Sequence, residues 1–131
     1  MAHGTTEQEP AAPEQTMPPD IETMRDSVRL LLREDAEPLA LDEVDTLALT
    51  LRGHIELLIP EVEYAAGKLD KDDVPRYCAL ACVGEARGKL RAQQPPGLDR
   101  GTVYARKLAR SLNALCDHHE NLGAERSGAG Q

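Results

Sequence analysis

The sequence predicts an all-α protein, namely a compact antiparallel four-helix bundle with a disordered N-terminal tail. Two observations favour this fold. Apolar residues recur at spacings of three and four in four segments between residues 20 and 122, and no segment shows the alternation of a β-strand. The connections between these segments are short, at about 4 to 7 residues, which favours antiparallel neighbours.

Polar segments flank the helical region at both ends. The chain has 131 residues, which is room for one domain. Its first 19 residues are mostly Glu, Pro, Ala, Thr and Gln and would bury too little apolar surface to offset the entropy of ordering. We therefore expect a disordered tail over residues 1–19, a helical bundle domain over 20–123 and a disordered C-terminus over 124–131.

The predicted helices cover about residues 20–35, 42–68, 73–92 and 99–122. Asp20, which follows two prolines, and Asp42 are the expected N-caps of the first two helices. Pro60 lies inside the second helix, where it predicts a kink or a break. Gly123 is expected to close the fourth helix.

The third predicted helix has an unusual inner face. Small side chains dominate the stripe that we expect to face the core, which consists of Val74, Cys78, Ala81, Cys82, Glu85 and Gly88. Gly84 and Gly88 lie in the middle of this helix, where each destabilises it by roughly 1 kcal/mol relative to Ala. We therefore expect a packing reason for them, such as the close approach of a neighbouring helix.

Composition argues against several classes of function. The formal net charge of −8 opposes general attraction to nucleic acid or anionic lipid, and three Tyr without Phe or Trp leave few platforms for stacking bases. No apolar run approaches the ~20 residues of a membrane span, and the N-terminus has no signal-peptide pattern. Three cysteines, an odd number, indicate reduced thiols. We therefore expect a cytoplasmic protein without nucleic-acid or membrane partners.

Inward polar residues form one candidate ligand site. His54 lies beside the apolar stripe of the second helix, Glu85 lies in that of the third, and His119 lies in that of the fourth. In a pocket between helices they would serve as ligand-binding or acid–base groups. The alternative is structural, with Glu85 paired to Arg52, Arg76 or His54.

A second candidate is a metal site. Cys78 and Cys82 are four residues apart, and Cys116 and His119 are three apart, so each pair shares a helix face. Zinc accepts thiolate and imidazole ligands. Neither a C-x2-C knuckle nor an H-E-x-x-H helix is present, and free Cys usually packs as a small hydrophobe. We therefore expect buried, reduced cysteines and no metal or other cofactor.

Charge is unevenly distributed along the chain. Residues 1–45 contain twelve acidic and three basic groups, whereas residues 87–110 contain seven basic groups and one acidic group. The basic segment suits an acidic partner or a phosphate, but the interpretation that we favour is a solvated helix face.

Three stretches resemble a known family. They are LRGHIELLIPEVE (residues 51–63), KDDVPRYCALACVGEARGKL (71–90) and YARKLARSLNALCDHHENL (104–122). In combination they resemble an uncharacterised family of small natural product biosynthesis proteins, with a domain of unknown function, from filamentous high-GC soil bacteria. The resemblance covers about residues 20–122 and implies an association with secondary metabolism. It supplies no reaction, cofactor or active site, so it assigns no functional residue.

These observations lead to two hypotheses of different classes. We expect an accessory or protein-interaction protein of natural product biosynthesis, with a protein partner and with homo-oligomers compatible with the sequence. The alternative is a small-ligand or metal-binding bundle, including an enzyme, that uses the inward polar residues His54, Cys82, Glu85, Cys116 and His119. No catalytic motif is recognisable. Convergent polar groups around a cavity would favour the alternative.

Overall fold

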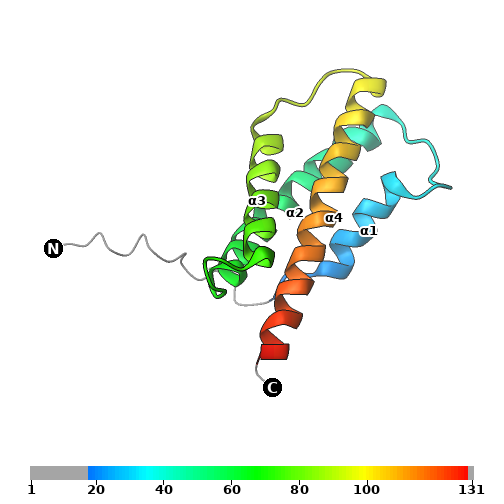
Figure 1. Cartoon of the computed structure of the whole chain (residues 1–131). Coiled ribbons are helices and arrows are strands. Elements are labelled where there is room, and N and C mark those ends of the chain that lie inside the picture. Colours follow the sequence, from blue (N-terminus) through cyan, green and yellow to red (C-terminus); the bar gives the residue numbers. More distant parts are fainter. Residues whose placement is uncertain (1–17, 130–131) are drawn as a thin grey trace.

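Four helices run up, down, up and down in the computed structural model of the chain, which describes residues 18–129 and side-chain surroundings as far as Gly123 (Figure 1). They are α1 (Ile21–Leu32), α2 (Leu41–Gly67), α3 (Val74–Arg91) and α4 (Leu98–Ala129). α4 lies between α1 and α3 and also packs on α2, whereas α1 and α3 do not touch within the described part of the chain. The predicted antiparallel four-helix bundle is thus confirmed. Residues 1–17 of the expected tail lie outside the described residues.

Local side chains determine where α1 and α2 begin. Asp20 is the N-cap of α1, as predicted, and accepts hydrogen bonds from the backbone N–H of Thr23 at 3.1 Å and from its hydroxyl at 2.8 Å. The expected cap of α2, Asp42, is wrong, because Ala40 occupies the N-cap position. The Glu43 carboxylate accepts a hydrogen bond from the Ala40 N–H at 2.8 Å, which is the half of a capping box that does not depend on the N-cap side chain. The Glu43 N–H donates to the Asp42 side chain at 3.0 Å.

α2 is continuous through Pro60, so the predicted break does not occur. Proline in a helix interior costs roughly 3 kcal/mol because it removes a hydrogen bond and crowds the preceding turn. Leu58, Ile59 and Val62 flank it and are buried. Burying each such side chain contributes roughly 1.5 to 3 kcal/mol, so packing outweighs the penalty.

The predicted inner face of α3 is wrong. The buried residues are Ala79, Val83 and Ala86, whereas Cys78 and Glu85 are exposed. The predicted stripe and the observed stripe both have helical spacing, and both contain alanine. Periodicity alone therefore does not determine which of the two stripes faces the core. The structure buries the stripe that contains the larger Val83 and partly buries Leu90 with it.

The glycines of α3 consequently do not mark a helix crossing inside the bundle. A Cβ at Gly84 would meet nothing within 4 Å, and one at Gly88 would meet only the Arg91 guanidinium at 3.8 Å. The expectation of a close packing contact within the chain is therefore wrong for both positions.

α4 and α2 together supply most of the centre of the core. The fully buried side chains of α4 come from one stripe, as predicted, and include Ala105, Leu108, Ala109, Leu112, Leu115 and Cys116. Gly97 precedes the helix with a φ of 92°, a left-handed conformation that favours glycine, and its carbonyl accepts a hydrogen bond from the Gly101 N–H at 2.9 Å. The helix continues past Gly123 to Ala129, so Gly123 does not close it. No helix in the described region combines the length and apolar character needed to cross a membrane.

Candidate functional site

Glu85, the acidic member of the predicted ligand site, lies on the surface. Its side chain is 70% exposed and forms an ion pair with Lys89 one turn later on the same helix, with 3.6 Å between Oε2 and Nζ. The expectation that Glu85 faces the core is therefore wrong, and its ion-pair partner is neither Arg52, Arg76 nor His54. Because the pair is exposed, it contributes at most a few tenths of a kcal/mol.

The three cysteines occupy three different environments. Cys78 is exposed, Cys82 is half-buried and Cys116 is buried, so the expectation of burial holds fully only for Cys116. Burial raises the pKa of the Cys82 thiol and raises that of Cys116 to about 11. The Cys116 thiol is therefore protonated at neutral pH, which is unfavourable for a nucleophile or a metal ligand.

Nothing in the described part of the chain brings the candidate metal ligands together. His119 is half-buried on α4, on the same helix as Cys116, while Cys78 and Cys82 lie on α3. No group of three or more His, Cys, Asp or Glu side chains within the described residues is placed to hold a metal ion.

His54 is enclosed on the side of α2 that faces the start of α1. Its Nε2 is shielded from solvent and has no hydrogen-bond partner among the described residues. Burial lowers the pKa of the imidazole, and the nearby Asp20 carboxylate opposes this shift more weakly. His54 is thus held as a neutral side chain next to the N-cap of α1, whereas Glu85 lies on the surface of α3 beside Lys89.

This environment predicts acid sensitivity. The unfolded chain, with an ordinary histidine pKa of about 6.5, binds a proton there before the folded chain does, so the free energy of unfolding should fall as pH drops from 7 to about 5. His54→Gln should flatten this dependence, whereas His118→Gln should retain it. Urea titrations at each pH measure the effect. Asp20 also affects the free energy of unfolding, because its hydrogen bonds to Thr23 lower the pKa of its carboxyl group in the folded chain. Its stabilising contribution is lost only at a pH below the range in which His54 titrates. A wild-type slope in His54→Gln would contradict the assignment.

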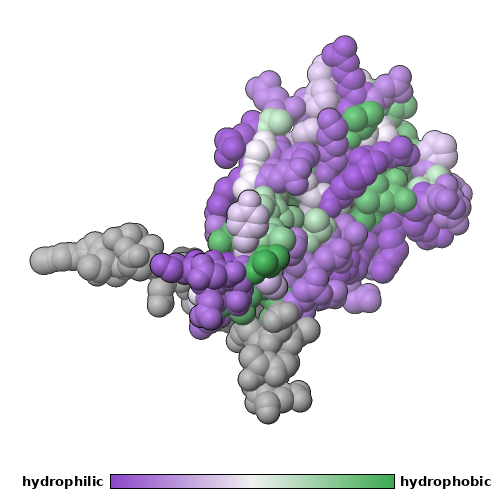
Figure 2. All heavy atoms as spheres, in the orientation of Figure 1, coloured by the Kyte–Doolittle hydropathy of each residue, from purple (hydrophilic) through white to green (hydrophobic). Residues whose placement is uncertain are grey.

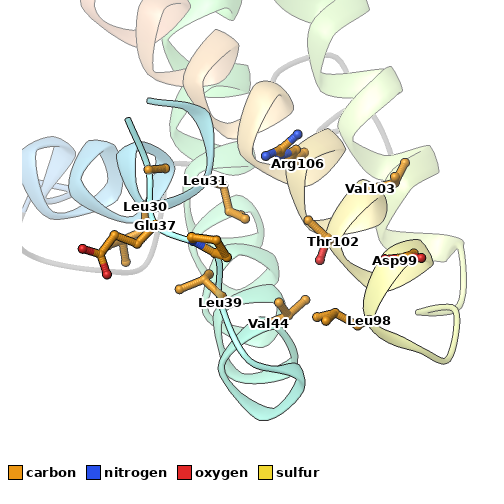
Figure 3. A pocket seen from close by; sticks show the side chains of 12 residues that line it. Leu30, Leu31, Glu37, Leu39, Val44, Leu98, Asp99, Thr102, Val103 and Arg106 are labelled. Atoms are coloured by element: carbon orange, nitrogen blue, oxygen red, sulfur yellow. The ribbon is translucent and has the colours of Figure 1, made fainter. Parts of the chain in front are cut away.

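A groove of about 490 Å³ lies between the C-terminal end of α1, the connection that follows it and the first turns of α4 (Figure 3). We call it the α1–α4 groove. Most of its lining is apolar, and these residues are Leu30, Leu31, Ala36, Pro38, Leu39, Val44, Leu98 and Val103. The polar residues are Glu37, Asp99, Thr102 and Arg106. The groove therefore suits an occupant that is largely apolar and carries charge at its edges.

Large apolar side chains are exposed along this groove. Leu30 and Val103 are each 55% exposed, and Leu98 is 44% exposed. Figure 2 shows the corresponding hydrophobic surface over the end of α1 and the first turns of α4. The floor is continuous with the core through Leu31 and Val44, which are buried. Contiguous apolar surface of this kind, bordered by polar groups, is typical of an interaction site.

One arginine fixes α1 against α4 beyond the groove, on the C-terminal half of α4. The Arg25 guanidinium donates to the Asn113 side-chain oxygen at 2.7 Å, to Asp117 at 3.0 Å and to Glu120 at 2.7 Å. Met24 and the following apolar stripe of α1 pack into the core beside it. The groove is therefore formed by two helices in a defined register rather than by a loop alone.

A second hollow of about 410 Å³ lies on the other flank of α4. Gln93 and Pro95 from the α3–α4 connection line it, and it shares Asp99 and Val103 with the α1–α4 groove. The exposed side of α4 between the two hollows forms a ridge, which consists of Asp99, Arg100, Val103, Arg106, Lys107 and Arg110. We call it the α4 ridge.

The cations of the α4 ridge differ from half of the other cations in the described part of the chain, which form ion pairs. Arg25, Arg29, Arg33, Arg87 and Lys89 form ion pairs. Arg100, Arg106, Lys107 and Arg110 form none with a described residue, and Asp99 is the only acidic member of the ridge. The ridge therefore presents a net positive surface beside an apolar groove.

Sequence reasoning found part of this site and missed the rest. The basic run over residues 87–110 was recognised, but its interpretation as a solvated face left out the apolar neighbours. Leu98 and Val103 lie within the basic run but outside the buried stripe of α4. Large apolar residues on the polar side of a helix are the sequence feature that indicates an interaction surface here. Leu30 gives the same signal on α1, because it lies outside the stripe of Met24, Val28 and Leu31.

Comparison with known proteins gives one match. A family model described as a family of unknown function (DUF6415) matches residues 22–124, which include nearly all of the described bundle. No functionally curated protein and no solved structure matched the chain.

Proposed function

The chain belongs to this family of unknown function, and from the geometry of the α1–α4 groove we propose that it is a cytoplasmic accessory protein that binds a partner protein. The occupant that fits the groove is an amphipathic helix with an apolar face and acidic flanks. The association with natural product biosynthesis that the sequence resemblance implies is part of this proposal.

One observation carries the proposal, namely the juxtaposition of exposed leucine and valine side chains with unpaired cations. Val103 projects from the α4 ridge between Arg106 and Lys107 and lines both hollows. An amphipathic helix docks by inserting apolar residues spaced at i, i+3, i+4 and i+7 into such a groove. Acidic residues on its flanks would then meet the unpaired cations of the ridge, which increases the association rate and selects the orientation.

Other occupants fit this surface less well. Nucleic acid is disfavoured by the net charge of −8 and the scarcity of aromatic residues. The groove is open along one side, whereas small-molecule sites usually bury most of the ligand surface. His54, Glu85 and His119 do not line it, so no observation favours the ligand-binding or catalytic alternative built on those residues.

Affinity capture with matched variants tests the proposal. The full chain is immobilised and exposed to lysate of its native host, and retained proteins are identified by mass spectrometry. Val103→Glu places a charge in the apolar contact and Arg106→Glu reverses the nearby cation, so both should release the partner. Leu49→Glu changes a leucine that is 66% exposed on α2, outside both hollows, and should retain it.

The binding segment of the retained partner then provides a quantitative test. Calorimetry with the corresponding synthetic helix should show at least roughly tenfold weaker binding for Val103→Glu and Arg106→Glu than for Leu49→Glu. Added salt should weaken binding to the unsubstituted chain. Equal capture by all variants, or a retained segment without acidic residues, would contradict the proposal.

A further inference from the structure

The outer side of α3 is an apolar helix face without a partner in the chain. α3 packs on α2 and α4 through Ala79, Val83 and Ala86, and in Figure 1 it forms one edge of the bundle. On its opposite side, Val74 is 69% exposed and Tyr77 is 73% exposed. Ala81, Gly84 and Gly88 share that side. This stripe therefore has helical periodicity, although no other helix of the described chain covers it and only the Arg91 side chain reaches it, at Gly88.

We infer that this face pairs with the same face of a second copy of the chain. The two α3 helices run antiparallel about a two-fold axis near Leu80 and Ala81. This interface lies on a different helix from the α1–α4 groove, so the inference is independent of the proposed function.

Large and small residues are complementary in this arrangement. With the axis near residues 80 and 81, Tyr77 of one copy lies opposite Gly84 of the other, and Val74 lies opposite Gly88. A Cβ at Gly84 would meet nothing within 4 Å in the single chain, so space for the tyrosine ring is available there. Glycine in a helix interior costs roughly 1 kcal/mol relative to Ala, and a contact between copies supplies the packing reason that the single chain lacks.

Charges are complementary in the same register. Asp73, the N-cap of α3, makes no side-chain capping hydrogen bond, and the Arg91 guanidinium lies 3.8 Å from the position of a Cβ at Gly88. Neither forms an ion pair with a described residue. The antiparallel arrangement places Asp73 of each copy near Arg91 of the other, at both ends of the interface. A two-fold axis requires such a self-complementary surface.

The size of the face sets the expected affinity. An α-helix of 18 residues is about 27 Å long. A contact strip of this length and about 10 Å in width covers less than the roughly 1,200 to 2,000 Å² that stable interfaces bury, so this is a small interface of the weak, transient class. We expect a reversible dimer with a dissociation constant on the order of 10 µM.

Sedimentation equilibrium of the full chain, from about 1 to about 300 µM, tests the pairing. The unsubstituted chain should change from monomer to dimer over this range. Gly84→Leu fills the space opposite Tyr77 and should weaken dimerisation at least roughly tenfold, with helicity retained because Leu is the better helix former. Gly53→Leu is the matched control, because the added side chain on α2 also meets nothing within 4 Å, and it should dimerise as the unsubstituted chain does.

Charge reversal tests the antiparallel register. Asp73→Arg alone and Arg91→Asp alone each place like charges together at both ends and should dimerise weakly. A mixture of the two variants forms hetero-dimers in which both end pairs are again opposite in charge, so the mixture should associate more tightly than either variant. A monomer at every concentration, equal dimerisation of Gly84→Leu and Gly53→Leu, or a mixture no tighter than its components would overturn the inference.

Discussion

Leu112→Ala is expected to lower the free energy of unfolding by about 3 to 5 kcal/mol, the largest effect anticipated for a single substitution in this chain. Leu112 is fully buried on α4, which, like α2, contacts each of the other three helices. The substitution removes buried carbon atoms, so the favourable free energy of transferring them from water to the core is lost. It also leaves a cavity that the surrounding helices fill only partly. Because a domain of this size is stable by roughly 5 to 15 kcal/mol, the variant should be close to unfolding.

Urea denaturation followed by far-ultraviolet circular dichroism measures this change. Leu49→Ala is the matched control, since the same truncation at a leucine that is 66% exposed should alter stability by less than about 0.5 kcal/mol. Similar losses in both variants would show that α4 does not lie in the centre of the core.

Arg52→Ala is expected to produce the second-largest effect, a loss of about 2 to 3 kcal/mol. Arg52 extends from α2 to the end of α3, where it donates a hydrogen bond to the Leu90 carbonyl at 2.6 Å and contacts the Ala92 carbonyl at 3.4 Å. It also donates to the hydroxyl of Tyr104, which is buried on α4. One side chain thus connects three helices and satisfies carbonyls that the last turn of α3 leaves without intrahelical partners.

A double-mutant cycle separates this connection from general packing. Arg52→Ala and Tyr104→Phe should be coupled by more than about 0.5 kcal/mol, because each removes a bond that the other residue needs. Arg110→Ala, which removes an exposed arginine of the α4 ridge, should be nearly neutral. Additive effects of Arg52→Ala and Tyr104→Phe would contradict the role assigned to this contact.

Helix positions in this chain could be predicted because three of the four helices carry one dominant apolar stripe. In α4 the large residues Leu108, Leu112 and Leu115 leave no competing face, and the structure buries all three. α3 has few large side chains, and its alanines and glycines fit either orientation. The observed inner face is therefore displaced by one residue, about 100° on a helical wheel, from Cys78, Cys82 and Glu85 to Ala79, Val83 and Ala86.

The same displacement explains why the candidate ligand residues did not converge. The expected inward position of Glu85 depended on the α3 stripe, so the predicted site with His54 and His119 had no acidic member once that stripe faced outward. The α1–α4 groove could not be assembled from sequence, because its lining comes from the end of α1, the following connection, the start of α2 and the start of α4. The sequence shows that Val103 and Leu98 lie within a basic run. It does not show that they lie close to Leu30, because this proximity depends on how α1 packs against α4.

Site-specific photo-crosslinking tests the central claim, that the α1–α4 groove binds an acidic amphipathic helix of another protein. Benzoylphenylalanine is introduced in place of Val103 in the full chain, expressed in its native host, and in place of Leu49 as the control. After irradiation, mass spectrometry of the adducts should identify one acidic helical segment of a partner linked to position 103 and absent from position 49. Adducts at position 103 that match those of the control, or that contain only a second copy of the chain or a small molecule, would contradict the claim.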